Sequence, residues 1–202
     1  MVQEQLFMNA ATKILITLTL LILVAAAYMR FGPTTITNMQ EKGTIAALAK
    51  GDMARLDLPE APYPLEDYIL MLEDDSPVRL SEMRGKILLV NIWASYCAPC
   101  QYEMKDLNAL QVALGGADFE VVAINTDRGG VRVARETLIE WDVPDLKLYA
   151  DPKMNTAFGL AEGRLPTSLI VDRDGMVLAS YTGPLDWADD DALAMFTALM
   201  RR

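Results

Sequence analysis

The residues of this chain best suited to chemistry are its two cysteines, Cys97 and Cys100, which are separated by two residues. The apolar run 87–93 before them predicts a buried strand, and the run 101–114 after them carries apolar residues at helical spacing. Cysteines three positions apart at the start of a helix lie on one face, within the separation that a disulfide can close. The order strand, turn, helix therefore predicts a redox-active dithiol at the turn.

The two cysteines are expected to differ in reactivity. Cys97 would lie at the helix start, where unpaired backbone N–H groups and the helix dipole favour a thiolate, so its pKa should fall below about 8.5. Pro99 is tolerated there because first-turn N–H groups have no intrahelical partner. Cys97 is thus the candidate nucleophile, and Cys100, one turn further into the helix, is the candidate resolving thiol.

The cysteine pair has two alternative uses, a structural disulfide and half of a zinc site. A bridge across two residues closes almost no loop and so stabilises a fold little. Zinc requires four ligands, mostly Cys and His, and this chain has two Cys and no His. Because neither alternative fits the sequence, redox chemistry is the predicted use of the cysteine pair. The sequence predicts no metal site.

Several longer motifs accompany the dithiol. They are the segment 80–104 with Trp-Ala-Ser-Tyr-Cys-Ala-Pro-Cys at its centre, Phe-Glu-Val-Val-Ala-Ile-Asn at 119–125, Leu-Pro-Thr-Ser-Leu-Ile-Val-Asp at 165–172 and Gly-Pro-Leu-Asp-Trp-Ala at 183–188. They are spread over residues 80–188, and the resemblance that they carry extends over most of residues 59–202. This part of the chain resembles the membrane-anchored bacterial TlpA-like thioredoxins, relatives of ResA and CcmG, and is most similar to the TlpA branch.

The pattern of elements and the resemblance together predict the fold. Strand-like runs alternate with helix-like runs and end in a hairpin and a helix, which indicates an α/β protein with a mixed sheet. The resemblance implies a thioredoxin fold, a mixed central sheet flanked by helices, with an insert near 127–160. We expect a membrane anchor or signal at 1–30, a tether at 31–58 and the thioredoxin-like domain at 59–202.

The segment 14–29 is uncharged and nearly all apolar, between Lys13 and Arg30. A bilayer span requires about 20 apolar residues, and the long stems of the flanking side chains extend the segment toward that length. The prediction is an N-terminal transmembrane helix. The alternative is a cleaved signal peptide with its cleavage site at Ala25–Ala27. Either way the domain is exported, which the resemblance places on the periplasmic side of a bacterial inner membrane.

Further site residues follow from the resemblance. Thioredoxin-like proteins have a cis-proline facing the cysteine pair, and Pro166 matches that position. The backbone of Leu165 is then expected to pair with a substrate strand. Trp93 and Tyr96 flank the cysteine motif; Trp93 suits the core or a pocket wall, and Tyr96 a partly exposed rim that a partner contacts. We assign these four residues to substrate binding.

Glu103 is the candidate proton acceptor for Cys100, because it lies three residues further along the same helix face. A plain acid of the first helical turn, stabilised by the dipole, is the alternative. TlpA-like proteins resemble this chain in carrying a glutamate here. Asn91 departs from the buried aspartate that thioredoxins have at this strand position, and an amide cannot take a proton. Any side-chain acid–base role therefore moves to Glu103.

The expected activity is that of an exported thiol–disulfide oxidoreductase that needs no cofactor besides its own dithiol. The net charge of −10 argues against nucleic acid as a partner, because phosphates would repel the chain. The Ala-Pro pair between the cysteines holds no cation to favour the thiolate further, which points to a reductant of protein disulfides. The resemblance implies assembly factors of cytochrome oxidase or cytochrome c as substrates, a membrane-embedded electron donor, and a monomer.

Two other functions remain as alternatives. A peroxidase of the peroxiredoxin type shares the fold, but such enzymes use a lone cysteine in a threonine-containing loop near an arginine. A non-catalytic copper chaperone on this fold needs a histidine beside the cysteines, and the chain has none. Insulin-disulfide reduction, peroxide consumption and copper retention distinguish the three.

Overall fold

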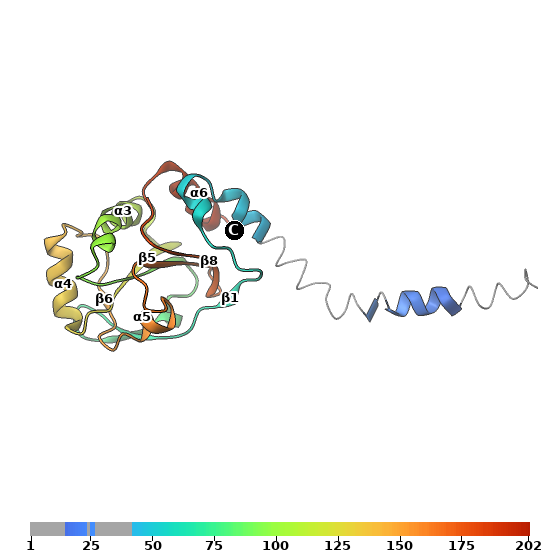
Figure 1. The fold of residues 1–202 in the computed structure, drawn as a ribbon, viewed down its shortest axis with the longest axis horizontal. Coiled ribbons are helices and arrows are strands. Elements are labelled where there is room, and N and C mark those ends of the chain that lie inside the picture. The colour runs from blue at the N-terminus through green and yellow to red at the C-terminus, as the bar shows by residue number, and fades with distance from the viewer. Residues whose placement is uncertain (1–14, 24, 27–41) are drawn as a thin grey trace, which may run out of the picture. The chain divides into compact units, whose positions relative to one another are not determined.

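The strand that precedes the cysteines, β4 (Ile87–Trp93), lies in the interior of a mixed sheet. All seven of its residues are buried, as expected for a continuous apolar run covered on both faces. The computed structural model describes residues 15–23, 25–26 and 42–202, of which 42–202 form one compact unit (Figure 1).

Within the described residues the sheet has eight strands in the order β1-β8-β7-β4-β5-β6-β2-β3. The other strands are β1 (Tyr63–Pro64), β2 (Ile69–Met71), β3 (Pro77–Arg79), β5 (Phe119–Asn125), β6 (Tyr149–Ala150), β7 (Thr167–Val171) and β8 (Met176–Thr182). β4 runs parallel to β5, as predicted for a helical crossover, and antiparallel to β7. The predicted hairpin of β7 and β8 is also present.

Helices cover both faces of the sheet (Figure 1). They are α3 (Ala98–Leu114), α4 (Gly130–Glu140), α5 (Asn155–Gly159) and α6 (Asp190–Met200), with short 3-10 turns η1 (Gly51–Arg55) and η2 (Leu80–Met83). α3, α4 and α6 contribute to the apolar cluster that contains Leu89 and Trp93, whereas α5 contributes to the cluster of Val90 and Ile92 on the opposite face. Because side chains alternate along a strand, β4 supplies both layers of the core.

These layers bear out the predicted thioredoxin-like α/β fold. Residues 127–160, where the sequence predicts an insert, hold α4, β6 and α5, which follow β5 and lead to β7.

Residues 42–58, assigned from the sequence to the tether, pack against this core. Residues 42–48 are helical, and Ile45 and Met53 are buried in the same cluster as the α6 residue Phe196. Asp57 also pairs with Ser180 of β8 through backbone hydrogen bonds of 2.8 and 3.0 Å. The folded unit thus includes residues before Pro59, because their apolar side chains complete the α6 side of the core.

The predicted N-terminal transmembrane helix is not supported. Residues 15–23 and 25–26 are helical, yet no helix in the part of the chain that the structure describes has the length and apolar content to cross a bilayer. Lys13, Arg30 and the tether residues 31–41 lie outside the described residues.

Candidate active site

The two cysteines lie at the junction of β4 and α3, as the sequence predicts. Cys97 is the N-cap of α3, and its sulfur accepts a hydrogen bond of 3.3 Å from the backbone N–H of Cys100. The two residues form a disulfide, with their Cα atoms 5.3 Å apart. In the reduced protein the same N–H is placed to stabilise a Cys97 thiolate, as helix N-termini do.

The two cysteines differ in exposure in the direction expected for an attacking Cys97 and a resolving Cys100. Cys97 is 7% exposed, whereas Cys100 is fully buried. The neighbouring Tyr96, Ala98 and Pro99 are exposed, Tyr96 to 69%. A partner can therefore reach the disulfide from the Cys97 side, over a rim of apolar surface, and the position of Tyr96 fits its predicted rim role.

Glu103 is buried on the inner face of α3, one turn after Cys100, and is 1% exposed. Its Oε1 accepts a 2.6 Å hydrogen bond from Nδ2 of Asn91 on β4. Its Oε2 accepts hydrogen bonds from the backbone N–H of Leu185, at 3.3 Å, and from Nε1 of Trp187, at 3.2 Å. A plain solvated acid of the first helical turn does not have these surroundings, so the alternative interpretation of Glu103 does not hold.

Burial raises the pKa of Glu103 from 4.5 to about 7. The three hydrogen bonds oppose that rise because they favour the carboxylate, and the charge of Asp106 adds to it. The side chain is therefore poised to gain or lose a proton near neutral pH. Such a carboxylate, one turn from a buried thiol, suits general acid–base work on that thiol.

The Leu165–Pro166 peptide bond is cis, which confirms that prediction. Thr167, the next residue, pairs with Ile92 near the end of β4. Pro166 therefore lies at the same edge of the sheet as the loop that leads from Trp93 to Cys97. The carbonyl oxygen of Pro166 accepts a 2.9 Å hydrogen bond from the N–H of Gly183. The backbone predicted to pair with a substrate strand is that of the residue before it, Leu165.

Trp93 is the exception among the predicted substrate-binding residues. It is 1% exposed, and its ring packs against Trp141 with centroids 5.3 Å apart. A side chain this deeply buried offers no surface to a partner, so its assignment to substrate binding was wrong. Trp93 instead belongs to the buried apolar cluster that also contains Cys97 and Cys100.

Asp127 and Ser95 also belong to the site, although the sequence alone did not predict them there. Asp127 follows β5 and is 8% exposed, and its carboxylate accepts hydrogen bonds from both the N–H and the hydroxyl of Ser95. The available signal was the polar run Asn-Thr-Asp directly after a buried parallel strand, beside the strand that carries the cysteines. Side chains at the carboxyl ends of parallel strands commonly meet at one edge of a sheet.

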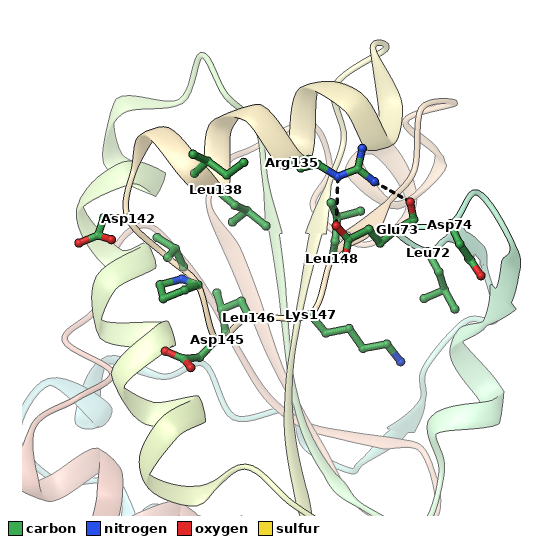
Figure 2. Close-up of a pocket in the computed structure, with 13 residues that line it drawn as sticks. Leu72, Glu73, Asp74, Arg135, Leu138, Asp142, Asp145, Leu146, Lys147 and Leu148 are labelled. Atoms are coloured by element: carbon green, nitrogen blue, oxygen red, sulfur yellow. Dashed lines mark hydrogen bonds and ion pairs between the residues drawn. The ribbon is translucent and has the colours of Figure 1, made fainter.

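A large pocket of about 890 Å³ lies beside the site rather than in it (Figure 2). It is bounded by α4, by residues 142–148 and by the turn at 72–74 between β2 and β3. Arg135 crosses it and donates hydrogen bonds to the side chain and the carbonyl oxygen of Glu73, at 3.1 and 2.7 Å. Its lining includes none of the predicted site residues.

The Redoxin family matches residues 58–195 of this chain. Among curated relatives, thiol-disulfide oxidoreductase ResA of Geobacillus kaustophilus is 28% identical over 187 residues, covering 93% of this chain and 92% of the relative. The thiol:disulfide interchange protein HelX of Rhodobacter capsulatus is 35% identical over 114 residues, which span 55% of this chain and 61% of HelX.

Solved structures give the same result for the fold. A putative thiol:disulfide interchange protein DsbE from Chlorobium tepidum superposes with a TM-score of 0.61 at 27% identity, covering 72% of this chain and 99% of that one. A DsbF homologue from Corynebacterium diphtheriae superposes with a TM-score of 0.59 at 22% identity, covering 72% and 93%. In this family the redox group is the cysteine pair itself. The chain belongs to the Redoxin family and is a thiol–disulfide oxidoreductase of the TlpA, ResA and CcmG group.

Proposed function

We propose that the protein reduces disulfides of exported proteins, with Cys97 as the attacking thiol and Cys100 as the resolving thiol. The observation that carries this proposal is the difference between the two sulfurs, one at the helix N-cap with a route to the surface and one fully buried beyond it. No cation stands between them, since residues 98 and 99 are Ala and Pro. The thiolate is then stabilised mainly by the helix start, which favours a reductant over a strong oxidant.

The reaction proceeds in two exchanges. The Cys97 thiolate attacks one sulfur of the substrate disulfide, which breaks that bond, releases one substrate thiolate and forms a mixed disulfide. Cys100 then loses its proton and attacks the sulfur of Cys97, which releases the second substrate thiolate. The enzyme is left with the Cys97–Cys100 disulfide, and two electrons have passed to the substrate, whose thiolates take up protons.

Glu103 is the proposed acceptor of the Cys100 proton. It lies one turn after Cys100 on the buried side of α3, and its pKa of about 7 lets it accept a proton near neutral pH. Tyr96, within the cysteine loop, and the backbone of Leu165, before the cis-proline, are the proposed contacts of the substrate. Reduction of the resulting disulfide is assigned to a membrane-embedded dithiol donor.

The experiment that tests the activity uses the full chain after reduction of Cys97 and Cys100. The reduced protein is mixed with oxidised insulin, and thiols are counted on both partners. One disulfide lost from insulin for each disulfide gained by the protein supports the proposal. Loss of the protein's thiols to hydrogen peroxide with no change in insulin would instead support the peroxidase alternative.

The proposed pathway is cytochrome assembly, in which the protein would reduce disulfides of partner proteins to the thiols that receive copper or haem. This part of the proposal rests on the resemblance to TlpA-like thioredoxins. Two oxidised peptides distinguish the two cargoes: one carries the Cys-x-x-Cys-His pattern of a haem-attachment site, the other a cysteine pair of a copper-receiving site. The peptide that the reduced protein reduces faster identifies the branch. Equal, slow rates with both would argue against a role in cytochrome assembly.

Attachment to the inner membrane through residues 14–29 is likewise a proposal, supported by the apolar sequence of that segment. Cell fractionation followed by N-terminal sequencing tests it. An intact N-terminus in the membrane fraction supports the anchor, and a mature end at Tyr28 would show that the segment is a cleaved signal peptide.

A further inference from the structure

A network of hydrogen bonds at the end of β5 holds the loop that presents Cys97. Oδ2 of Asp127 accepts hydrogen bonds from the N–H of Ser95, at 2.8 Å, and from Nδ2 of Asn125, at 2.7 Å. Oδ1 of Asp127 accepts one from the Ser95 hydroxyl at 3.0 Å, and the Asp127 N–H donates to Oδ1 of Asn125 at 3.0 Å. One buried carboxylate thus collects three donors, two of them from the residue two positions before Cys97.

The same edge of the sheet also fixes the residue before this loop. Both the N–H and the hydroxyl of Thr126 donate to the carbonyl oxygen of Trp93, at 2.9 and 3.1 Å. The loop itself closes on a 3.1 Å hydrogen bond from the N–H of Cys97 to the carbonyl oxygen of Ala94. Residues 125–127 therefore hold the backbone from Trp93 to Ser95, and the turn at 94–97 carries that constraint to Cys97.

The position of Cys97 matters because its sulfur lies at the N-cap of α3, 3.3 Å from the N–H of Cys100. The helix-start stabilisation of a thiolate is short in range and depends on direct alignment with unpaired N–H groups. If the loop moves away from the helix, the sulfur loses that alignment and the thiolate loses its stabilisation.

We propose that Asp127 is a positioning residue of the dithiol: by holding Ser95 it keeps Cys97 at the helix N-cap and so sets the thiolate stability and the reduction potential of the pair. This deepens the proposed function and rests on it for its biological meaning. Asp127 acts through Ser95 and takes no part in proton or electron transfer.

A second interpretation of the same geometry has the opposite consequence, which makes the proposal testable. A carboxylate near a thiol disfavours the thiolate by charge repulsion, so its neutralisation would lower the thiol pKa. A carboxylate that positions the thiol at the helix start has the reverse effect when it is lost. Asp127→Asn separates the two: the amide keeps the shape but has one acceptor oxygen in place of two, and its NH₂ group would face a donor.

The experiment measures the pKa of Cys97 in the reduced full chain from the pH dependence of its alkylation by iodoacetamide, and the reduction potential against glutathione. In Asp127→Asn we expect the Cys97 pKa to rise by about one unit, with attack at pH 7 slowed up to about tenfold. The potential should become more negative, because a less stable thiolate destabilises the reduced form. Neither readout requires a protein substrate, so failure of the proposed function leaves this test intact.

Two further variants complete the test. Ser95→Ala removes one of the three donors to Asp127 without altering charge. It should raise the Cys97 pKa and make the reduction potential more negative, as Asp127→Asn does, but by less. This variant also keeps the proposal falsifiable if Asp127→Asn does not fold. Asp172→Asn is the matched control, since Asp172 accepts two backbone N–H bonds, from Asp174 and Met176, in the β7–β8 turn. Val171 pairs with Leu88, near the start of β4, which places that turn at the opposite edge of the sheet.

We expect Asp172→Asn to lower stability and leave the Cys97 pKa unchanged. A lower or unchanged pKa in Asp127→Asn would overturn the proposal, as would a Ser95→Ala protein that titrates like wild type. An equal shift in the Asp172→Asn control would also overturn it, because the effect would then follow stability and not position.

Discussion

Asn91 donates a 2.6 Å hydrogen bond from its side-chain amide to the carboxylate of Glu103, deep between β4 and α3. Asn91 is held in turn by a 2.9 Å hydrogen bond to the hydroxyl of Ser168 on β7. Its Oδ1 is buried and, among the residues that the structure describes, has no hydrogen-bond partner. Rotation of this amide would present Oδ1 to Glu103, so the same side chain can donate to the carboxylate or accept from the protonated acid.

The first prediction concerns the proposed role of Glu103 as acceptor of the Cys100 proton. In Glu103→Gln, resolution of the mixed disulfide by Cys100 should be slower, by about 10²-fold or less, the low end of general acid–base effects. In the wild type the resolution rate should rise with pH through about 7 as the carboxylate forms. The variant should lack this component and keep only the rise that follows ionisation of the Cys100 thiol itself. The measurement is release of a thiol leaving group from the preformed mixed disulfide, followed from pH 5 to pH 9. Superimposable profiles would return Glu103 to a structural role.

Asp106→Asn is the matched variant for that experiment. The charge of Asp106 raises the pKa of Glu103, so its removal should move the midpoint of the resolution profile to lower pH while leaving the maximal rate in place. An unchanged midpoint would show that another group governs the profile.

The second prediction concerns stability, because the folded state binds the Glu103 proton more tightly than the unfolded state does. Below pH 4.5 both states are protonated; between about 4.5 and 7 only the folded state keeps the proton, so stability falls as pH rises, and it levels off above about 7. The loss is on the order of 3 kcal/mol. Glu103→Gln should flatten this part of the curve and be more stable than wild type at pH 8. Urea unfolding from pH 4 to pH 8 measures both, and parallel curves would contradict the prediction.

The third prediction concerns Trp187, which donates to Glu103 at 3.2 Å from a fully buried ring. Trp187→Phe keeps most of the apolar contact and removes the donor. Because hydrogen bonds to the carboxylate lower its pKa, we expect the pKa of Glu103 to rise and the resolution midpoint to move to higher pH. Stability should fall by about 1.5–3 kcal/mol at pH 8 and by less at pH 5, where the acid is neutral. An equal loss at both pH values would assign the effect to packing.

The fourth prediction separates residues 42–58 from the segment before them. A chain that begins at Lys42 should fold and reduce insulin like the full chain, because residues 42–202 form the compact unit. Deletion to Pro59 removes the buried Ile45 and Met53 and should destabilise the domain strongly; Met53→Ala alone should cost about 2–5 kcal/mol. Thermal unfolding of the three proteins measures this. Equal stability of the two truncated chains would show that residues 42–58 are a tether after all.

Much of the fold followed from the sequence. The uninterrupted apolar run of β4, the helical spacing of α3 and the Asp-Gly turn before β8 each predict local structure, and the chain order predicts a parallel pair joined by α3. The cis bond at Pro166 came from resemblance alone, since arbitrary proline bonds are cis about 5–6% of the time. The start of the folded unit was not apparent, because Ile45 and Met53 stand in short, weakly periodic segments whose burial depends on α6, far along the chain.

The functional site was also only partly predictable, because some of its contacts join residues far apart along the chain. Local spacing is enough to identify Cys97 and Cys100, and it places Glu103 on the same helix face. The choice of Glu103 as proton acceptor, however, depended on the resemblance. The contact of Glu103 with Asn91 and Trp187 joins positions 12 and 84 residues apart, which no local pattern reports. Trp93 was assigned to substrate because it neighbours the motif, yet strand alternation turns it into the core against Trp141. Asp127 was missed because its partner, Ser95, lies 32 residues away along the chain, just after the end of the neighbouring strand β4.

The central claim is that Cys97 attacks the substrate and Cys100 resolves the mixed disulfide. The most direct measurement uses reduced Cys100→Ser and Cys97→Ser proteins, each mixed with oxidised insulin, with the covalent products mapped by mass spectrometry under non-reducing conditions. We expect Cys100→Ser to accumulate a mixed disulfide through Cys97, and Cys97→Ser to form little adduct because its remaining thiol is fully buried. Accumulation of adduct through Cys100, with none through Cys97, would contradict the account.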